Sequence, residues 1–143
     1  MVNRVVSWDG TDYSPLPGLS ENGVDSPTFV SVRALAAVDA GDGEKLYVGG
    51  FFSSAGGDGA IQGLGTWDGT AWNRYVGAGN SSSEATALMP ITWEGAPALL
   101  AGGRFQVPNS AETACVGIYQ VMSEIFTDDF EAGDTSAWSL AAP

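Results

Sequence analysis

Two aspartates stand beside a tryptophan and before a glycine, and paired carboxylates are the groups with which glycosidases act. Asp9 occurs in Trp8-Asp9-Gly10 and Asp68 in Trp67-Asp68-Gly69. Their separation would distinguish retaining from inverting enzymes within a range of about 5 to 9.5 Å. An aspartate before a glycine is also typical of a tight turn, because its side chain accepts backbone N–H bonds. We interpret both as turn residues and keep the carboxylate pair as the alternative.

Acidic residues gather at two further places, where their oxygens could bind Ca²⁺. Asp39, Asp42 and Glu44 lie within six residues, and the equivalent turn later in the chain keeps only Glu94. A second group near the C-terminus comprises Asp128, Asp129, Glu131 and Asp134. Neither group has the alternating spacing of a calcium loop. We interpret the first as a solvated hairpin turn and the second as a solubilising segment, and we predict no metal or cofactor site.

Five aromatic side chains could stack on sugar rings: Trp8, Tyr13, Trp67, Trp72 and Trp93. The first four recur at equivalent positions of a repeat, which is what packing between repeated units would require of large amphipathic side chains. Trp93 has no aromatic equivalent and stands at a turn. We therefore expect the first four side chains to pack in the core or between repeated units, and Trp93 to be exposed.

Three smaller features carry weaker signals. Residues 56–65 are rich in glycine but lack the Lys-Ser/Thr step of a phosphate-binding loop, and we interpret them as a connection between repeated units. Asn80-Ser81-Ser82 matches a glycosylation triplet that chance explains. Cys115 precedes an apolar segment, and we expect a small buried side chain there. No catalytic residue is predicted.

Composition excludes several kinds of chemistry. The 143 residues contain no His and one Cys, which removes Ser-His-Asp catalysis, imidazole metal sites and an internal disulfide. A formal net charge of −12 argues against binding to nucleic acid or to anionic lipid. No apolar run approaches the roughly 18 residues of a membrane span, and residues 1–9 lack the pattern of a signal peptide. The 20 glycines favour many turns, and thus an all-β domain.

The elements that must position these residues repeat along the chain. Ser7-Trp8-Asp9-Gly10-Thr11 returns as Thr66-Trp67-Asp68-Gly69-Thr70 after 59 residues. Residues 32–35 and 46–52 return as 85–88 and 99–105 after 53 residues, and Gly65-Thr66-Trp67 returns weakly as Gly117-Ile118-Tyr119 after 52. The unit is thus about 50 to 60 residues long, present twice, with the start of a third.

Each unit is predicted to contain two hairpins. The first unit has strands at 2–8, 13–16, 31–38 and 45–50, and the second at 63–67, 72–76, 85–92 and 98–102. The Asp-Gly pairs at residues 9–10 and 68–69 predict two-residue type I′ turns, in which both central residues need a positive φ. Four short antiparallel strands at this period predict blades of a β-propeller. The fold predicted is therefore all-β, a partial propeller of about two four-stranded blades plus one strand, over residues 1–121, followed by an acidic tail at 122–143.

Paired glycines interrupt one strand of each unit, as Gly49-Gly50 and Gly102-Gly103. Glycine inside a strand costs packing and entropy, so its presence requires a reason. We expect a second backbone to approach closely there, with a strand-ending bulge as the alternative.

The combination of these motifs resembles a known family. Trp-Asp-Gly-Thr followed by an aromatic residue, a spaced Ala-Leu and the stretch Leu46 to Gly57 is similar to the kelch-like repeats of large secreted bacterial β-propeller proteins. Residues 130–139 contain a Phe-Glu-x-Gly-Asp-Thr-Ser-x-Trp-Ser core, which resembles a short acidic segment that closes many secreted bacterial proteins. It also resembles the first strand of a jelly-roll sugar-binding domain. The resemblance implies a propeller and says little about activity.

Propellers usually have four to eight blades, more than this chain supplies. We expect the chain to be the C-terminal part of a longer protein with its signal peptide upstream, or to self-associate through open sheet edges. The function expected is that of a non-catalytic extracellular or cell-envelope segment that binds a protein or a glycan through its loops. The alternative is a fragment of a carbohydrate-active hydrolase or lyase with carboxylates on other blades.

Overall fold

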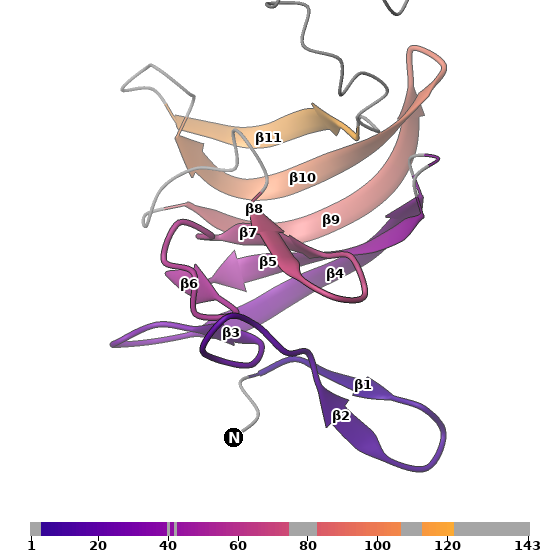
Figure 1. Ribbon diagram of the computed structural model, residues 1–143. Coiled ribbons are helices and arrows are strands. Elements are labelled where there is room, and N and C mark those ends of the chain that lie inside the picture. Colours follow the sequence, from indigo (N-terminus) through magenta and orange to yellow (C-terminus); the bar gives the residue numbers. More distant parts are fainter. Residues whose placement is uncertain (1–3, 40, 42, 75–82, 107–112, 122–143) are drawn as a thin grey trace, which may run out of the picture.

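The chain folds into antiparallel β-sheets (Figure 1). The computed structural model describes residues 4–39, 41, 43–74, 83–106 and 113–121, and all its regular elements over these residues are strands, eleven in number and grouped in four sheets. No sheet among them closes on itself. The all-β class is therefore confirmed.

A four-stranded sheet lies at the centre of the molecule. Its strands are β4 (Ser31–Asp39), β5 (Glu44–Phe51), β7 (Leu64–Trp67) and β8 (Trp72–Arg74), in the spatial order β4-β5-β7-β8. The tryptophan hairpin β7–β8 is added to the edge of β5, with Leu46 opposite Trp67 and Gly49 opposite Leu64. The sheet is therefore a simple antiparallel meander.

A three-stranded sheet repeats most of this arrangement. It contains β9 (Glu84–Trp93), β10 (Ala96–Gln106) and β11 (Thr113–Gln120), in the order β11-β10-β9. Gly49 pairs with Ala34 and Leu64, and its repeat equivalent Gly102 pairs with Ala87 and Val116. The duplicated sequences therefore adopt the same register, with β4, β5 and β7 corresponding to β9, β10 and β11.

Two small sheets complete the described part of the chain. β1 (Val6–Trp8) pairs with β2 (Tyr13–Pro15), and β3 (Val24–Asp25) pairs with β6 (Ser54–Ala55). Figure 1 shows β1, β2 and β3 below the four-stranded sheet, on the side away from β11, and β6 beside β5. The N-terminal segment thus covers one side of the central sheet.

The predicted grouping of hairpins into units was wrong. We expected each tryptophan hairpin to share a sheet with the hairpin that follows it, but β7–β8 pairs with the preceding hairpin β4–β5, and β1–β2 forms a sheet of its own. A repeated pattern looks the same whichever hairpin begins it, and only backbone pairing between β5 and β7 decides the grouping. Residues 56–65 therefore lead from β6 into β7, which belongs to the same sheet as β4 and β5. They do not link two separate units.

The predicted turn types also need correction. Trp8 pairs with Tyr13 and Trp67 with Trp72, so each Asp-Gly pair begins a four-residue loop instead of forming a two-residue turn. Only the glycines have a positive φ, +102° at Gly10 and +97° at Gly69. A two-residue turn with two positive φ values, the type I′ pattern, occurs instead at Glu94 and Gly95 (φ +53° and +83°).

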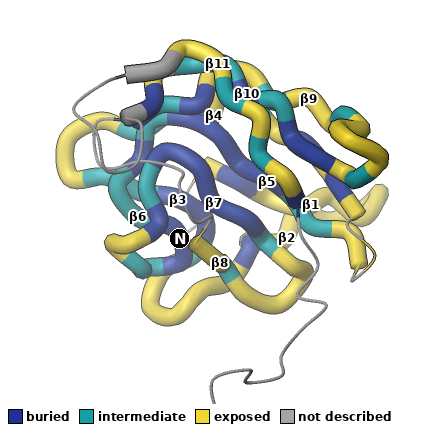
Figure 2. Tube along the Cα trace, turned by 90° about the horizontal axis from the view of Figure 1, so that it is seen from above, coloured by how far each residue is buried: buried dark blue, intermediate teal, exposed yellow. Residues whose placement is uncertain are grey.

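The central sheet has a core on each face, and β5 is buried or half-buried along most of its length between them (Figure 2). On one face, an inter-sheet core joins it to the three-stranded sheet: Ala36, Val38, Tyr47, Leu64, Ala85, Leu99, Ala101, Phe105 and Val121. On the other, an N-terminal core joins it to the small sheets: Val5, Leu16, Val24, Val48, Phe52, Ala55 and Ile61. Neighbours Tyr47 and Val48 belong to different cores, because successive strand residues point to opposite faces.

The paired glycines have two different roles. A Cβ at Gly49 would lie 2.8 Å from the Cβ of Ala85, which belongs to the other sheet, so the expected close approach is present there. A Cβ at Gly50 would collide with the Ser31 carbonyl of its own sheet, and one at Gly103 would collide with the equivalent Glu84 carbonyl. Both second glycines lie beside a register shift, so the bulge alternative holds for them.

Replacing Gly49 by alanine tests the contact between the two large sheets. We expect Gly49→Ala to lower the free energy of unfolding by about 1 to 3 kcal/mol, because the new methyl overlaps Ala85. Gly102→Ala is the matched control, since its Cβ would meet only the Ala87 Cβ at 3.6 Å. Urea unfolding of both variants measures the difference, and equal stabilities would contradict the close packing.

Replacing Gly69 by valine tests the β7–β8 loop. Gly69 has a φ of +97° with open space around it, so a β-branched residue is opposed by backbone strain alone. We expect Gly69→Val to lower the free energy of unfolding by about 1 kcal/mol or more. Gly59→Val is the control, because Gly59 also faces open space but lacks a positive φ. An unchanged melting temperature for Gly69→Val would contradict the loop geometry.

Candidate functional site

Asp9 and Asp68 organise the loops in which they stand. The Asp9 Oδ1 accepts hydrogen bonds from the backbone N–H groups of Thr11 and Asp12, both at 2.8 Å. The Asp68 Oδ1 accepts from the N–H groups of Thr70 and Ala71 at 2.8 Å and from the Thr70 hydroxyl at 2.7 Å, while its Oδ2 accepts from the Asn73 amide at 2.9 Å. The two loops therefore share one turn design, and the interpretation as turn residues agrees with these bonds.

These hydrogen bonds hold both carboxylates in the ionised form. The pKa of Asp68 lies well below its ordinary value, chiefly because the Ala71 N–H and the Thr70 hydroxyl donate to it. The pKa of Asp9 is lowered in the same way by the N–H groups of Asp12 and Thr11. A glycosidase general acid needs the opposite shift, a pKa raised toward neutrality. The lowered pKa values therefore argue against Asp9 and Asp68 as the carboxylate pair of a glycosidase.

The acidic residues considered for Ca²⁺ have turn contacts where the structure describes them. The Asp39 Oδ1 accepts hydrogen bonds from the backbone N–H groups of Gly41 at 2.7 Å and Gly43 at 3.2 Å. Asp42 and the four acids near the C-terminus lie outside the described residues. Within the described part of the chain, no three His, Cys, Asp or Glu side chains come together as a metal site would require.

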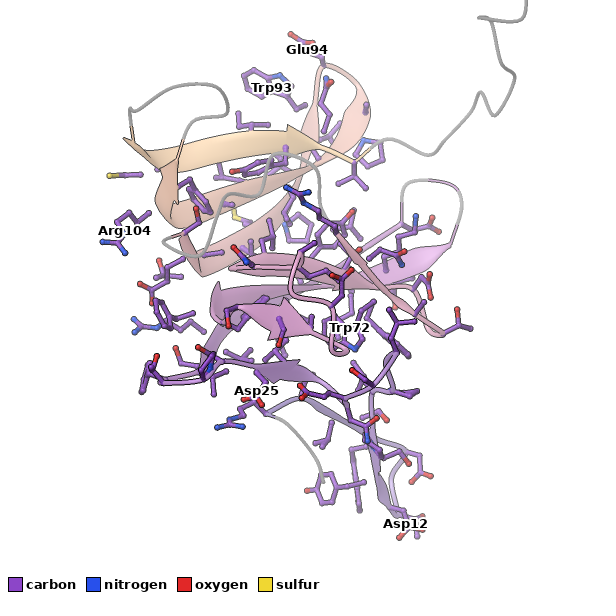
Figure 3. All side chains as sticks on the ribbon, turned by 60° about the vertical axis from the view of Figure 1, so that its left-hand side comes forward. Asp12, Asp25, Trp72, Trp93, Glu94 and Arg104 are labelled. Carbon is purple, nitrogen blue, oxygen red and sulfur yellow. The ribbon has the colours of Figure 1, made fainter. Side chains whose placement is uncertain are left out.

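The aromatic pairs of the two tryptophan hairpins differ in burial. Trp8 and Tyr13 stack with ring centroids 4.4 Å apart but are 53% and 72% exposed, so the expected packing between units was wrong for them. Trp67 and Trp72, with centroids 5.8 Å apart, are half-buried against the N-terminal core. Trp93 is 45% exposed beside Glu94 at the tip of β9–β10, as expected (Figure 3).

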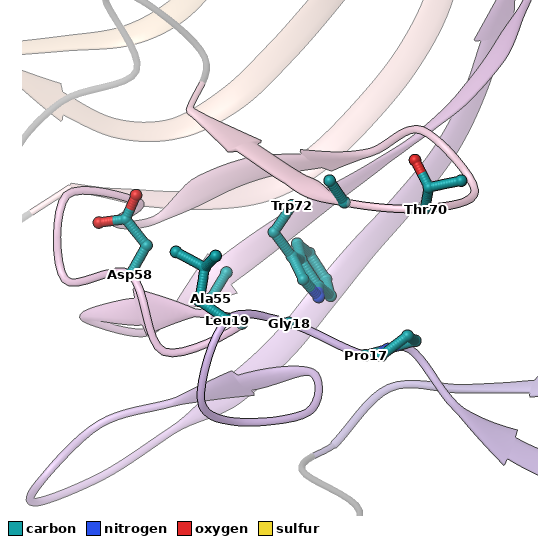
Figure 4. Close-up of a pocket in the computed structure, with 9 residues that line it drawn as sticks. Pro17, Gly18, Leu19, Ala55, Asp58, Thr70 and Trp72 are labelled. Atoms are coloured by element: carbon teal, nitrogen blue, oxygen red, sulfur yellow. The ribbon is translucent and has the colours of Figure 1, made fainter.

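A cavity of about 240 Å³ opens beside Trp72 (Figure 4). The segment between β2 and β3 forms one wall, the β6 region another, and the β7–β8 loop the third. Its lining residues are Pro17, Gly18, Leu19, Ala55, Gly56, Asp58, Thr70, Ala71 and Trp72. Sequence analysis missed this site because its walls come from three segments as much as 55 positions apart, and only Trp72 was recognised beforehand.

Contacts around the indole set the position of Trp72. Its Nε1 donates to the Leu16 carbonyl at 3.5 Å, and a Cβ at Gly56 would lie only 2.6 Å from the Trp72 Cδ1. Glycine at position 56 therefore leaves room for the ring. Asp58 and Thr70 contribute polar groups at opposite ends of the lining, on either side of the indole (Figure 4). An aromatic face between polar groups is suited to a ligand with both an apolar face and hydroxyl groups.

The minor sequence features have little part in this site. Cys115 is exposed on β11, so the expectation of a buried thiol was wrong. Cys115 falls within the edge strand β11 rather than before it, beside a shift in the β10–β11 register where it has no partner residue in β10. Asn80-Ser81-Ser82 lies outside the described residues.

No family model, no curated protein and no solved structure matches this chain. Over the described residues there is no helix with the length and apolar character that crossing a membrane demands.

The lowered pKa of Asp68 predicts how stability responds to acid. Because its pKa is lower in the folded than in the unfolded protein, its stabilising contribution is fully present above about pH 4 and is lost as the pH falls toward the folded pKa. Asp68→Asn keeps an oxygen acceptor but has no charge to lose. We expect the variant to lose less stability than the wild type between about pH 5 and pH 2 in urea unfolding. Parallel losses would contradict the role of this carboxylate.

Proposed function

We propose that this chain is a non-catalytic segment of a kelch-like β-propeller that works outside the cell or in the cell envelope. Two observations support this reading. The duplicated sequences share one strand register, and the two large sheets pack face to face around the inter-sheet core. The resemblance of the tryptophan and glycine motifs to secreted bacterial repeats supports the proposed location.

The ligand that we propose is a glycan, bound with one sugar ring in the cavity beside Trp72. The observation that carries this proposal is the half-buried indole between the Asp58 carboxylate and the Thr70 hydroxyl. A cavity of about 240 Å³ is below the range of about 300 to 1,000 Å³ for drug-sized ligands, so a single ring fits its scale. Leu19, 89% exposed at the wall, would add an apolar contact.

A catalytic role is less well supported. The alternative, a fragment of a hydrolase or lyase, needs a carboxylic acid that stays protonated near neutral pH. Asp9 and Asp68 have lowered pKa values and are engaged by loop N–H groups. We therefore favour binding over hydrolysis as the role of this segment.

A glycan array followed by titration calorimetry of the full chain tests the proposal. We expect a bound oligosaccharide whose affinity falls about tenfold in Leu19→Ser, the loss expected when one apolar contact of about 1.4 kcal/mol is removed. Asp58→Asn keeps an acceptor for the Ala60 N–H and removes the charge of this lining residue.

Trp93→Ala serves as the control, because it deletes an exposed tryptophan at the distant β9–β10 tip and should leave affinity unchanged. If no glycan on the array binds, the proposed ligand becomes a protein. Equal affinity in Leu19→Ser and the wild type would move the site away from this cavity.

A further inference from the structure

The three-stranded sheet exposes an apolar face on its outer side. We name as the open face the six residues Ala87, Met89, Leu100, Gly102, Val116 and Ile118, which lie opposite one another across β9, β10 and β11. Met89 is 52%, Val116 63% and Ile118 40% exposed. On the reverse of the same strands, Leu99 and Ala101 are fully buried in the inter-sheet core. Contiguous exposed apolar residues of this kind mark an interaction surface.

Each residue of the open face has a repeat equivalent on the central sheet, and there the equivalents are covered. Met89, Leu100 and Gly102 correspond to Ala36, Tyr47 and Gly49. Val116 and Ile118 correspond to Leu64 and Thr66. Ala36, Tyr47, Leu64 and Thr66 are between 1% and 7% exposed, because the three-stranded sheet packs on them. The open face is thus a second copy of a surface that already binds a sheet within this chain.

The internal interface shows what kind of surface fits. The first strand of the covering sheet places Ala85 over Gly49, and Glu84 Oε1 lies 2.8 Å from Arg33 Nε. At the open face, Gly102 offers the same room, since a Cβ there would meet only Ala87 of its own sheet. A partner sheet that fits the open face therefore needs a small residue at the position of Ala85 on its first strand. Its second strand needs aliphatic residues at the positions of Leu99 and Ala101, which docking would bury.

A second copy of this chain does not offer that partner surface. In the central sheet, the corresponding face contains Leu46, Val48 and Trp67 and is already packed in the N-terminal core. A net charge of −12 also opposes association between identical chains. The occupant must therefore bring its own uncovered sheet face.

We propose that the open face docks a further sheet of the same repeat, supplied by a polypeptide segment outside this chain, in the orientation in which β9 lies on β5. This inference rests on the repeat reading of the proposed function and names the surface through which the array of sheets continues. Docking has one direction, because the open face of one sheet receives the inner face of the next sheet. Such nearest-neighbour interfaces supply much of the stability of repeat proteins.

The test supplies the missing sheet to the intact protein. A flexible Gly/Ser linker joins the full chain to a second copy of residues 84–121, whose inner face carries Ala85, Leu99 and Ala101 without a sheet to cover. In the added copy alone, Met89, Val116 and Ile118 are replaced by Thr, so that the extension does not add a second apolar outer face. The tether raises the effective concentration to about millimolar. We expect the extended chain to bind less of an apolar fluorescent dye than the original chain. Its melting temperature should rise by about 4 °C or more.

Gly102→Leu in the host part separates docking from a general effect of the extension. The leucine would occupy the space for the incoming Ala85, so both gains should disappear. In the unextended chain the same change should be tolerated, because open space surrounds that position apart from Ala87. Gly59→Leu, at an exposed turn away from the open face, is the matched control and should keep both gains.

Three outcomes would overturn the proposal. The extended chain could show the dye binding and melting temperature of the original. Gly102→Leu could leave the gains intact. The unextended chain could form dimers in sedimentation that Gly102→Leu abolishes, which would assign the face to a second copy. Glycan binding beside Trp72 is measured separately on the unextended chain, so loss of either activity leaves the other standing.

Discussion

Burial of the strand β5 on both faces is the constraint on which the rest of the structure depends. Tyr47 and Leu64 face the three-stranded sheet, while Val48 and Trp67 face the N-terminal segment. A strand buried on both sides can carry few polar groups, and its backbone must pair with neighbouring strands. β5 meets this demand at the centre of a meander, and Gly49 lets Ala85 of the next sheet come within contact.

Three aspartates accept hydrogen bonds in loops at the ends of the sheets. These are Asp9, Asp39 and Asp68. Backbone N–H groups of the same turns donate hydrogen bonds to their carboxylates and so fix the shape of each turn. The acids of these loops therefore act as structural acceptors, even though their residue type would suit catalysis. The cavity beside Trp72 offers a different surface, because three segments meet there over a half-buried indole.

The proposed cavity and the open face lie on different sides of the central sheet. The cavity adjoins the N-terminal core, and the open face lies beyond the inter-sheet core (Figure 1). A repeat array that grows through one surface can in this way present its loops to a ligand without blocking them. Docking of a further sheet, as proposed, would therefore leave the proposed glycan cavity open.

The local features of this protein were determined by the sequence itself. Strand positions, the duplicated register and the turn role of the aspartates follow from alternation and from Asp-Gly pairs, which act over a few residues. Only the tertiary structure decided that β7 pairs with β5, that Trp67 is half-buried while Trp8 is exposed, and that Cys115 is exposed. It also brought Leu19, Asp58 and Trp72 around one cavity. These outcomes depend on contacts between residues far apart in the chain, and a repeated local pattern is compatible with more than one set of such contacts.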